Sequence, residues 1–126
     1  MTPKLAGILI VIAAMAVESL AQLALKVGSA GGPGIFAEPY RSRVGRWRLG
    51  GSSGAWMALG IACYVLEVCL YTLALQRLDL SVAFPLGSLC FVGVAMLSRI
   101  FLGEAVSGVR WMGVCCILAG CALIAS

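Results

Sequence analysis

The chain has 126 residues, of which 62% are hydrophobic and 11% are charged, and its formal net charge is +4. A water-soluble domain of this length is about half apolar and about one quarter charged. The polar residues are therefore too few to cover a soluble globule, and the composition predicts an integral membrane protein.

Four stretches are apolar and long enough to cross the hydrocarbon core of a membrane as helices, which takes roughly 20 residues. They are residues 5–26, 55–75, 80–100 and 108–125. None alternates polar and apolar residues as the strands of a membrane barrel do. The sequence therefore predicts an all-α integral membrane protein with four transmembrane helices in a single domain, residues 1–126.

The first expected helix contains a polar stripe in the segment AAMAVESLAQLALKVG. Glu18, Gln22 and Lys26 recur every four residues, so they share one helix face. A charged carboxylate at the centre of a span costs at least ~2.5 kcal/mol on insertion scales, so it normally faces a partner or a wet cavity. Glu18 is therefore a candidate for binding a proton or a cationic substrate. The alternative is a structural acid neutralised by Lys26 or Arg99.

The connection over residues 27–54 is expected to lie among the lipid headgroups, because aromatic and aliphatic residues interleave in it with arginines. One interpretation is an orientation signal with interfacial anchoring. The other is that basic residues bind a phosphate-bearing headgroup. The residues that would make these contacts are Lys26, Arg41, Arg43, Arg46 and Arg48.

The basic residues are unevenly distributed between the two sides of the expected bundle. Lys4 and Arg77 lie on one side, and the other basic residues lie on the opposite side. Cytoplasmic loops have an excess of Lys and Arg. The first and third loops are therefore expected in the cytoplasm and both termini outside.

The second expected helix holds a second membrane acid. Glu67 lies near its middle, with Tyr64 three residues before it and Tyr71 four residues after it on the same face. Two acids in so small a bundle are difficult to explain as packing. Glu67 is expected either to face the same cavity as Glu18, where two carboxylates would repel each other, or to face a partner subunit.

The third expected helix contains a proline in the segment SVAFPLGSLCFVG. Pro85 cannot donate a hydrogen bond to the carbonyl of Ser81, which predicts a helix kink, and Gly87 and Ser88 follow it. Kinked midplane helices recur in transporter sites, so Ser88 is expected near the cavity. A proline near a helix start also occurs without any function.

The fourth expected helix has small residues on one face, Gly113, Cys116 and Gly120. Small residues allow membrane helices to approach closely, so this face is predicted to be a packing or dimerisation surface.

The sequence offers little for enzyme chemistry. The six cysteines fall inside expected spans and the chain has no histidine, so they are interpreted as packing residues and no metal site is expected. There is no phosphate-binding glycine loop and no nucleophile–base pair with histidine. No cofactor, no nucleic-acid partner and no enzyme activity are expected.

Four helices, a glutamate in the first and the closing segment FLGEAVSGVRWMGVCCILAGCALI resemble the drug/metabolite transporter superfamily. VESLAQLALK is similar to the first helix of the small multidrug resistance transporters, in which a lysine follows a membrane glutamate eight residues later, as Lys26 follows Glu18. That glutamate binds protons and cationic substrate competitively, and the resemblance implies this role for Glu18. Tyr64, in CYVLE, is similar to the family's tyrosine in the second helix.

The second half, LALQRLDLSVAFPLGSLCFVGVAMLSRIFLGEAVSGVRWMGV, is more similar to the small subunits of the flippase for undecaprenyl-phosphate-linked aminoarabinose. Their basic first loop is paralleled by RSRVGRWR. The tryptophan that the multidrug family has near the position of Gly87 is missing, which argues against planar aromatic cations as substrates. Pro85 and Gly87 depart from the multidrug pattern, whereas Glu18 departs from the flippase subunits.

The resemblance implies a half-size transporter bundle in the bacterial inner membrane. One such chain is too small to enclose a pathway, so it is expected to dimerise among membrane lipids, with itself or with a related small subunit. Three functions stay open: moving an amphipathic or lipid-linked substrate with a cationic or sugar headgroup, proton-coupled export of small cations, and a non-transporting accessory subunit. The expected polar path comprises Glu18, Gln22, Tyr64, Glu67 and Ser88.

Overall fold

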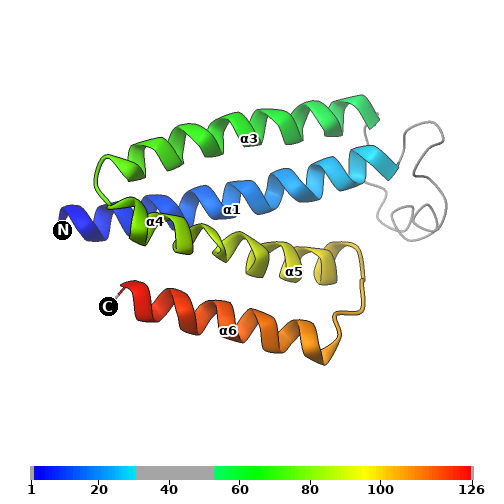
Figure 1. Cartoon of the computed structure of the whole chain (residues 1–126). Helices are drawn as coiled ribbons and strands as arrows, with labels where there is room; N and C mark the ends of the chain where they lie inside the picture. The colour runs from blue at the N-terminus through cyan, green and yellow to red at the C-terminus, as the bar shows by residue number, and fades with distance from the viewer. Residues whose placement is uncertain (1, 31–52, 126) are drawn as a thin grey trace.

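A computed structural model describes residues 2–30 and 53–125 of the chain, and these are almost entirely helical (Figure 1). The helices are α1 (Pro3–Ala30), α3 (Ser53–Leu75), α4 (Leu80–Gly87), α5 (Leu89–Phe101) and α6 (Gly108–Ala125). The two described ranges contain no strand, so the all-α prediction is confirmed. The residues proposed as phosphate contacts in the first loop, Arg41, Arg43, Arg46 and Arg48, lie outside the described residues.

Three helical segments are apolar and long enough to cross a membrane: α1 over Pro3–Ser29, α3, and α4 together with α5 over Leu80–Phe101. The apolar part of α6, Gly108–Ile124, is shorter. At 1.5 Å per residue, the 18 residues of α6 extend about 27 Å, close to the thickness of the hydrocarbon core.

α1 continues to Ala30, beyond the end expected at residue 26, so Lys26 lies inside the helix. The reason is the packing of this end against α3. A Cβ on Gly28 would lie only 2.9 Å from the backbone nitrogen of Met57, and the Ser53 hydroxyl donates a hydrogen bond to the Gly28 carbonyl. The contact with α3 stabilises the last turn of α1, which the local sequence alone does not predict.

The four spans form an open layer in the order α3, α1, α4 with α5, then α6 (Figure 1). Within the part of the chain that the structure describes, α6 contacts α4 and α5 and does not contact α1 or α3. The termini and the α3–α4 turn lie at one end of the layer, and the α5–α6 connection lies at the other (Figure 1). The bundle is therefore not closed into a ring by its own helices.

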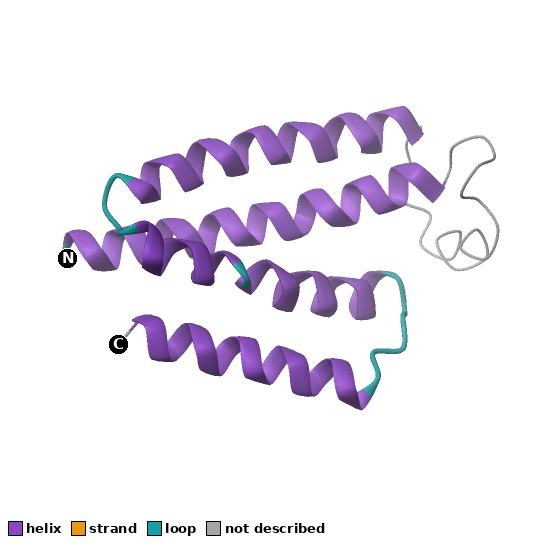
Figure 2. Cartoon of the chain, viewed as in Figure 1, coloured by secondary structure: helices purple, strands orange, loops and turns teal. Residues whose placement is uncertain are grey.

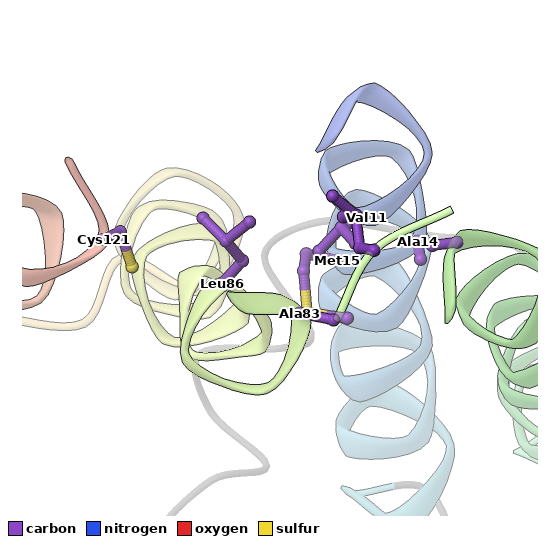
Figure 3. Packing of buried hydrophobic residues seen from close by; sticks show 8 residues of the cluster. Val11, Ala14, Met15, Ala83, Leu86 and Cys121 are labelled. Carbon is purple, nitrogen blue, oxygen red and sulfur yellow. The ribbon is translucent and has the colours of Figure 1, made fainter. Parts of the chain in front are cut away.

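The buried core lies at the centre of this layer and consists mostly of small side chains. Figure 3 shows Met15 reaching from α1 towards Ala83 of α4, while Cys121 approaches α4 from α6. Many large apolar side chains are exposed instead, among them Phe84 and Val109. An apolar exterior of this kind suits a bundle surrounded by lipid.

The third span is interrupted at Ser88, between α4 and α5 (Figure 2). A kink was expected here because Pro85 has no backbone N–H to donate. The chain tightens after the proline: the Ser88 N–H donates to the Pro85 carbonyl at 3.0 Å, and the Phe91 N–H donates to the Ser88 carbonyl at 3.1 Å. These bonds span three residues, as in a 3-10 turn, and they change the direction of the helix before α5 begins.

Candidate functional site

Glu18 lies half-buried in the middle of α1, next to residues of α3 and α5. The Cys90 thiol of α5, a hydrogen-bond donor, interacts with its carboxylate. Glu18 also interacts electrostatically with Tyr64 and Glu67 of α3. We call these four residues the acidic cluster: Glu18, Tyr64, Glu67 and Cys90. Two carboxylates that interact in this way repel each other when both are ionised.

The polar stripe expected on α1 continues onto α3. The Gln22 side-chain amide donates a hydrogen bond to the Tyr64 hydroxyl. Tyr71, one turn beyond Glu67 on α3, interacts electrostatically with that acid. The structure therefore brings together Glu18, Gln22, Tyr64 and Glu67, four of the five residues proposed for the polar path.

Ser88, the fifth residue of that path, lies elsewhere. Its hydroxyl donates to the Pro85 carbonyl at 2.6 Å and lies 3.5 Å from the Cys121 sulfur of α6. Among the described residues, its hydrogen bonds therefore serve the helix interruption and the contact with α6. A serine hydroxyl readily bonds a carbonyl one turn earlier in its own helix.

The close approach of α5 to α1 depends on two small residues. The Ser19 side chain is 2% exposed, and its hydroxyl lies 2.8 Å from the Met15 carbonyl and 3.2 Å from the Cys90 carbonyl. A Cβ on Gly93 would lie 2.9 Å from the Ser19 Cβ. Because Gly93 has no side chain, α5 can come near enough to α1 to place Cys90 beside Glu18.

The two basic residues suggested as structural partners of Glu18 make other contacts. The Lys26 ammonium forms an ion pair with Glu104 at 2.6 Å. The Arg99 guanidinium carbon lies 5.7 Å from the centroid of the Trp111 ring, a cation–π distance.

A pocket of about 690 Å³ extends from Gln22 towards the end of the layer where α5 meets the α5–α6 connection. Its walls are largely apolar, with Leu23 of α1 and Phe91 and Val94 of α5. The charged residues that line it are Lys26, Glu104 and Arg110. Gln22 thus belongs both to the polar stripe and to the wall of this pocket.

Glu104 reaches Lys26 because the chain reverses after α5. Gly103 has a φ of +63°, a left-handed conformation that favours glycine. The next residue, Glu104, donates its N–H to the Ser98 carbonyl at 3.3 Å. This turn folds Glu104 back over the end of α5, towards α1.

Sequence reasoning missed Glu104, Cys90 and Ser19 as parts of the site. Cys90 was grouped with the packing cysteines, since a thiol in an apolar span has no pattern that marks it. Glu104 is 78 residues from Lys26, and no spacing rule connects them.

The small-residue face of α6 is not covered by another helix of the described chain. A Cβ added to Gly113 or Gly120 would meet no atom within 4 Å, and Cys116 is exposed. The side of α6 that packs on the rest of the layer instead contains Val114 and Cys121, which are buried.

The sequence of the chain matches a known protein family. Residues 5–126 match the EamA-like transporter family. The chain is 37% identical over 65 residues to the "Probable 4-amino-4-deoxy-L-arabinose-phosphoundecaprenol flippase subunit ArnE" of Pseudomonas savastanoi pv. phaseolicola, a match that covers 52% of this chain and 57% of that protein. Proteins of the same name are 35% identical over 71 residues in Escherichia fergusonii and 36% identical over 69 residues in Yersinia pestis.

These matches cover 56% and 55% of this chain, and 64% and 60% of the respective relatives. The chain therefore matches less than two thirds of the length of each of the three relatives. No solved structure matches. Because the family match extends over nearly the whole sequence, the chain, a multi-pass membrane protein, belongs to the EamA-like transporter family.

Proposed function

We propose that this chain is one half of a transporter that moves an amphipathic or lipid-linked substrate with a cationic or sugar headgroup across the bacterial inner membrane. The observation that supports this most strongly is the acidic cluster, in which three helices bring Glu18, Glu67, Tyr64 and Cys90 together inside the spans. Membrane acids are costly, and they are usually retained for a substrate or a proton. Similarity to proteins named as flippase subunits for a lipid-linked amino sugar supports the substrate class.

The chemistry of such a headgroup suits the cluster. An aliphatic amine is protonated at neutral pH, so it would pair with the carboxylate of Glu18 or Glu67. The Gln22 amide and the Tyr64 hydroxyl would offer hydrogen bonds to sugar hydroxyls. When the amine leaves, a proton would replace it between the two acids, which would couple substrate release to proton binding.

A second subunit is part of the proposal, because one chain leaves the acidic cluster partly open. Glu18, Tyr64 and Glu67 are only half-buried, and α6 lies on the far side of α4 and α5. We infer a homodimer or a heterodimer with a related small membrane subunit. The uncovered face of α6, with Gly113 and Gly120, is the proposed contact.

The proposed orientation has both termini outside and the first and third loops in the cytoplasm. Lys4 and Arg77 line one pocket, of about 610 Å³, at the end with the α3–α4 turn. Lys26 and Arg110 line the pocket at the opposite end. The separation of these groups fits the excess of Lys and Arg that cytoplasmic loops have.

A proton-coupled exporter of small cations is the second candidate, favoured by the same pair of acids. The two functions differ in what they need from the ligand. Purified protein in detergent would release protons when guanidinium or a quaternary amine binds, if the protein were a cation exporter. A lipid transporter would give no such release, because the soluble cation lacks the apolar part of the substrate.

The test is a flipping assay in proteoliposomes with a short-chain polyprenyl phosphate that bears an amino sugar. We expect the amine to become accessible to a membrane-impermeant reagent faster than in protein-free vesicles, with no proton release by guanidinium. Proton release without flipping would support the cation exporter instead. If a correctly assembled complex shows neither flipping nor proton release, the result would support the function of a non-transporting accessory subunit.

A further inference from the structure

An ion pair between distant parts of the chain lines the pocket of about 690 Å³. Lys26 belongs to α1, and Glu104 belongs to the connection after α5; their charged atoms lie 2.6 Å apart. The Lys26 side chain is 39% exposed and the Glu104 side chain 18% exposed. A pair that retains this much solvent contact is weak enough for another anion to displace the carboxylate.

The interior of the pocket suits the apolar chain of an amphiphile. Its volume is in the range of roughly 300–1,000 Å³ that small-molecule sites occupy. Most of its apolar lining residues belong to α1 and α5. Its apolar residues include Leu23, Leu25, Phe91, Val94 and Leu97.

The charges that line the pocket suit a phosphate. Among the residues that the structure describes, Lys26 and Arg110 are two cations that line the pocket, and Glu104 is the one acid. A phosphate group is a stronger multidentate acceptor than one carboxylate, so it would compete with Glu104 for the Lys26 ammonium. The occupant to which we commit is an amphiphile with an apolar chain and a phosphate headgroup, not free phosphate.

We propose that Glu104 is a built-in competitor for the substrate phosphate: the phosphate displaces it from Lys26, binds Lys26 and Arg110, and releases the α5–α6 connection from α1. The inference rests on the proposed function, because it assigns a binding site to the same lipid-linked substrate. Lys26 follows Glu18 by eight residues, which is about 12 Å along the helix. The proposed phosphate site and the acidic cluster are therefore two separate sites, with Gln22 between them.

This arrangement predicts effects of opposite sign for the two partners of the ion pair. Removing the charge of Glu104 removes its competition for the Lys26 ammonium, so an alkyl phosphate binds more tightly. Removing the charge of Lys26 eliminates a ligand of the phosphate, so binding weakens. An ion pair with only a structural role would instead give equal or weaker binding in both variants.

The experiment measures dodecyl phosphate binding to the purified full chain in non-ionic detergent, by native mass spectrometry. We expect Glu104→Gln to bind ~1.5- to 5-fold more tightly than the wild type, as the weakness of such ion pairs implies. We expect Lys26→Gln to bind at least ~10-fold more weakly, because it loses a charged hydrogen bond to the phosphate. Asp79→Asn and Arg77→Gln remove the same charges at the opposite end of the layer and should leave the affinity unchanged. Unchanged or weaker binding in Glu104→Gln would overturn the proposal, as would inorganic phosphate binding as tightly as dodecyl phosphate.

A second measurement uses the wild-type protein and does not depend on any variant folding. A zero-length carbodiimide should join Lys26 to Glu104 by an amide bond, detected in the peptide mass spectrum. Dodecyl phosphate should lower the yield of this cross-link, and the neutral alcohol dodecanol should not. A yield that dodecyl phosphate leaves unchanged contradicts displacement.

The phosphate site and the transport function can be disproved separately. If dodecyl phosphate binds with the expected variant pattern while no flipping occurs, the phosphate site stands and the transport function is wrong. If flipping occurs while Glu104→Gln neither tightens binding nor alters the cross-link, the transport function stands and the role of Glu104 is wrong.

Discussion

At the scale of single residues, the membrane acids interact with neutral hydrogen-bond donors as well as with each other. Glu18 interacts with the Cys90 thiol, a hydrogen-bond donor, and Tyr64 accepts a hydrogen bond from Gln22. Such bonds fix the direction in which a carboxylate or a hydroxyl presents its remaining lone pairs. The orientation of Glu18 is therefore expected to depend on Cys90.

Cys90→Ala tests this dependence. The substitution removes the donor, and we expect flipping to slow several-fold while the free energy of unfolding falls by about 0.5–1.5 kcal/mol. The matched control is Cys69→Ala on α3, an exposed thiol. A flipping rate that is equal in the two variants would separate Cys90 from the mechanism.

The residues of the site differ in how well the sequence could predict them. Glu18 and Gln22 could be predicted, because helical spacing places them on one face and a membrane acid is conspicuous in an apolar helix. Cys90 and Glu104 could not, because their partners are set by the packing of distant helices. Ser88 was expected in the polar path, and its hydroxyl instead satisfies the Pro85 carbonyl, a local competition that the sequence does not resolve.

At the scale of helices, the site depends on how closely α5 approaches α1. Gly93 and Ser19 set that distance, while Gly28 and Gly60 permit the close contact of α1 with α3. The four apolar stretches could be predicted from composition and length. The interruption of the third span was expected from Pro85, whereas its position at Ser88 follows from the bonds of the turn.

Gly93→Ala tests the α1–α5 contact. Its Cβ would lie 2.9 Å from the Ser19 Cβ, so the helices must shift apart, and we expect a loss of about 1–3 kcal/mol in the free energy of unfolding in detergent. Gly108→Ala, at the start of α6, is the control, because nothing lies within 4 Å of its new methyl group. It should leave stability unchanged or slightly raised, since alanine is the better helix former.

The first loop has its own prediction. Arg43→Ala combined with Arg46→Ala should weaken the binding of phosphate-bearing lipid, because two cations are removed from a segment expected among the headgroups. Other basic residues still outnumber those on the opposite side, so the topology should not invert. Native mass spectrometry of co-purified lipid and cysteine accessibility would measure the two effects. Lipid binding equal to that of the wild type would show that these arginines act only as an orientation signal.

At the scale of the whole molecule, the chain is an open layer whose site is not enclosed by its own helices. α6 packs on α4 and α5 only, within the described residues, and its small-residue face has no neighbour there. The sequence predicted the helices of this layer but not its openness, since long-range helix order leaves no local pattern. The layer supports an assembly of two chains as the functional unit.

Gly113→Leu combined with Gly120→Leu tests this assembly. The larger side chains should prevent close contact between subunits and shift the protein from dimer to monomer, without changing the packing of α6 on α4 and α5. Leu118→Phe enlarges an exposed residue on a different face of α6 and should leave the dimer intact. Mass photometry in detergent or nanodiscs distinguishes the two states. A dimer fraction that survives the double substitution places the interface elsewhere.

The central claim is that Glu18 binds the moving headgroup, and the flipping rate of Glu18→Gln in proteoliposomes tests it most directly. The amide has nearly the same shape as the carboxyl group but cannot become an anion, so we expect flipping to fall to the rate of protein-free vesicles while assembly is retained. Asp79→Asn makes the same chemical change at the exposed α3–α4 turn and should flip at the wild-type rate. A wild-type rate in Glu18→Gln would contradict the claim and remove Glu18 from the mechanism.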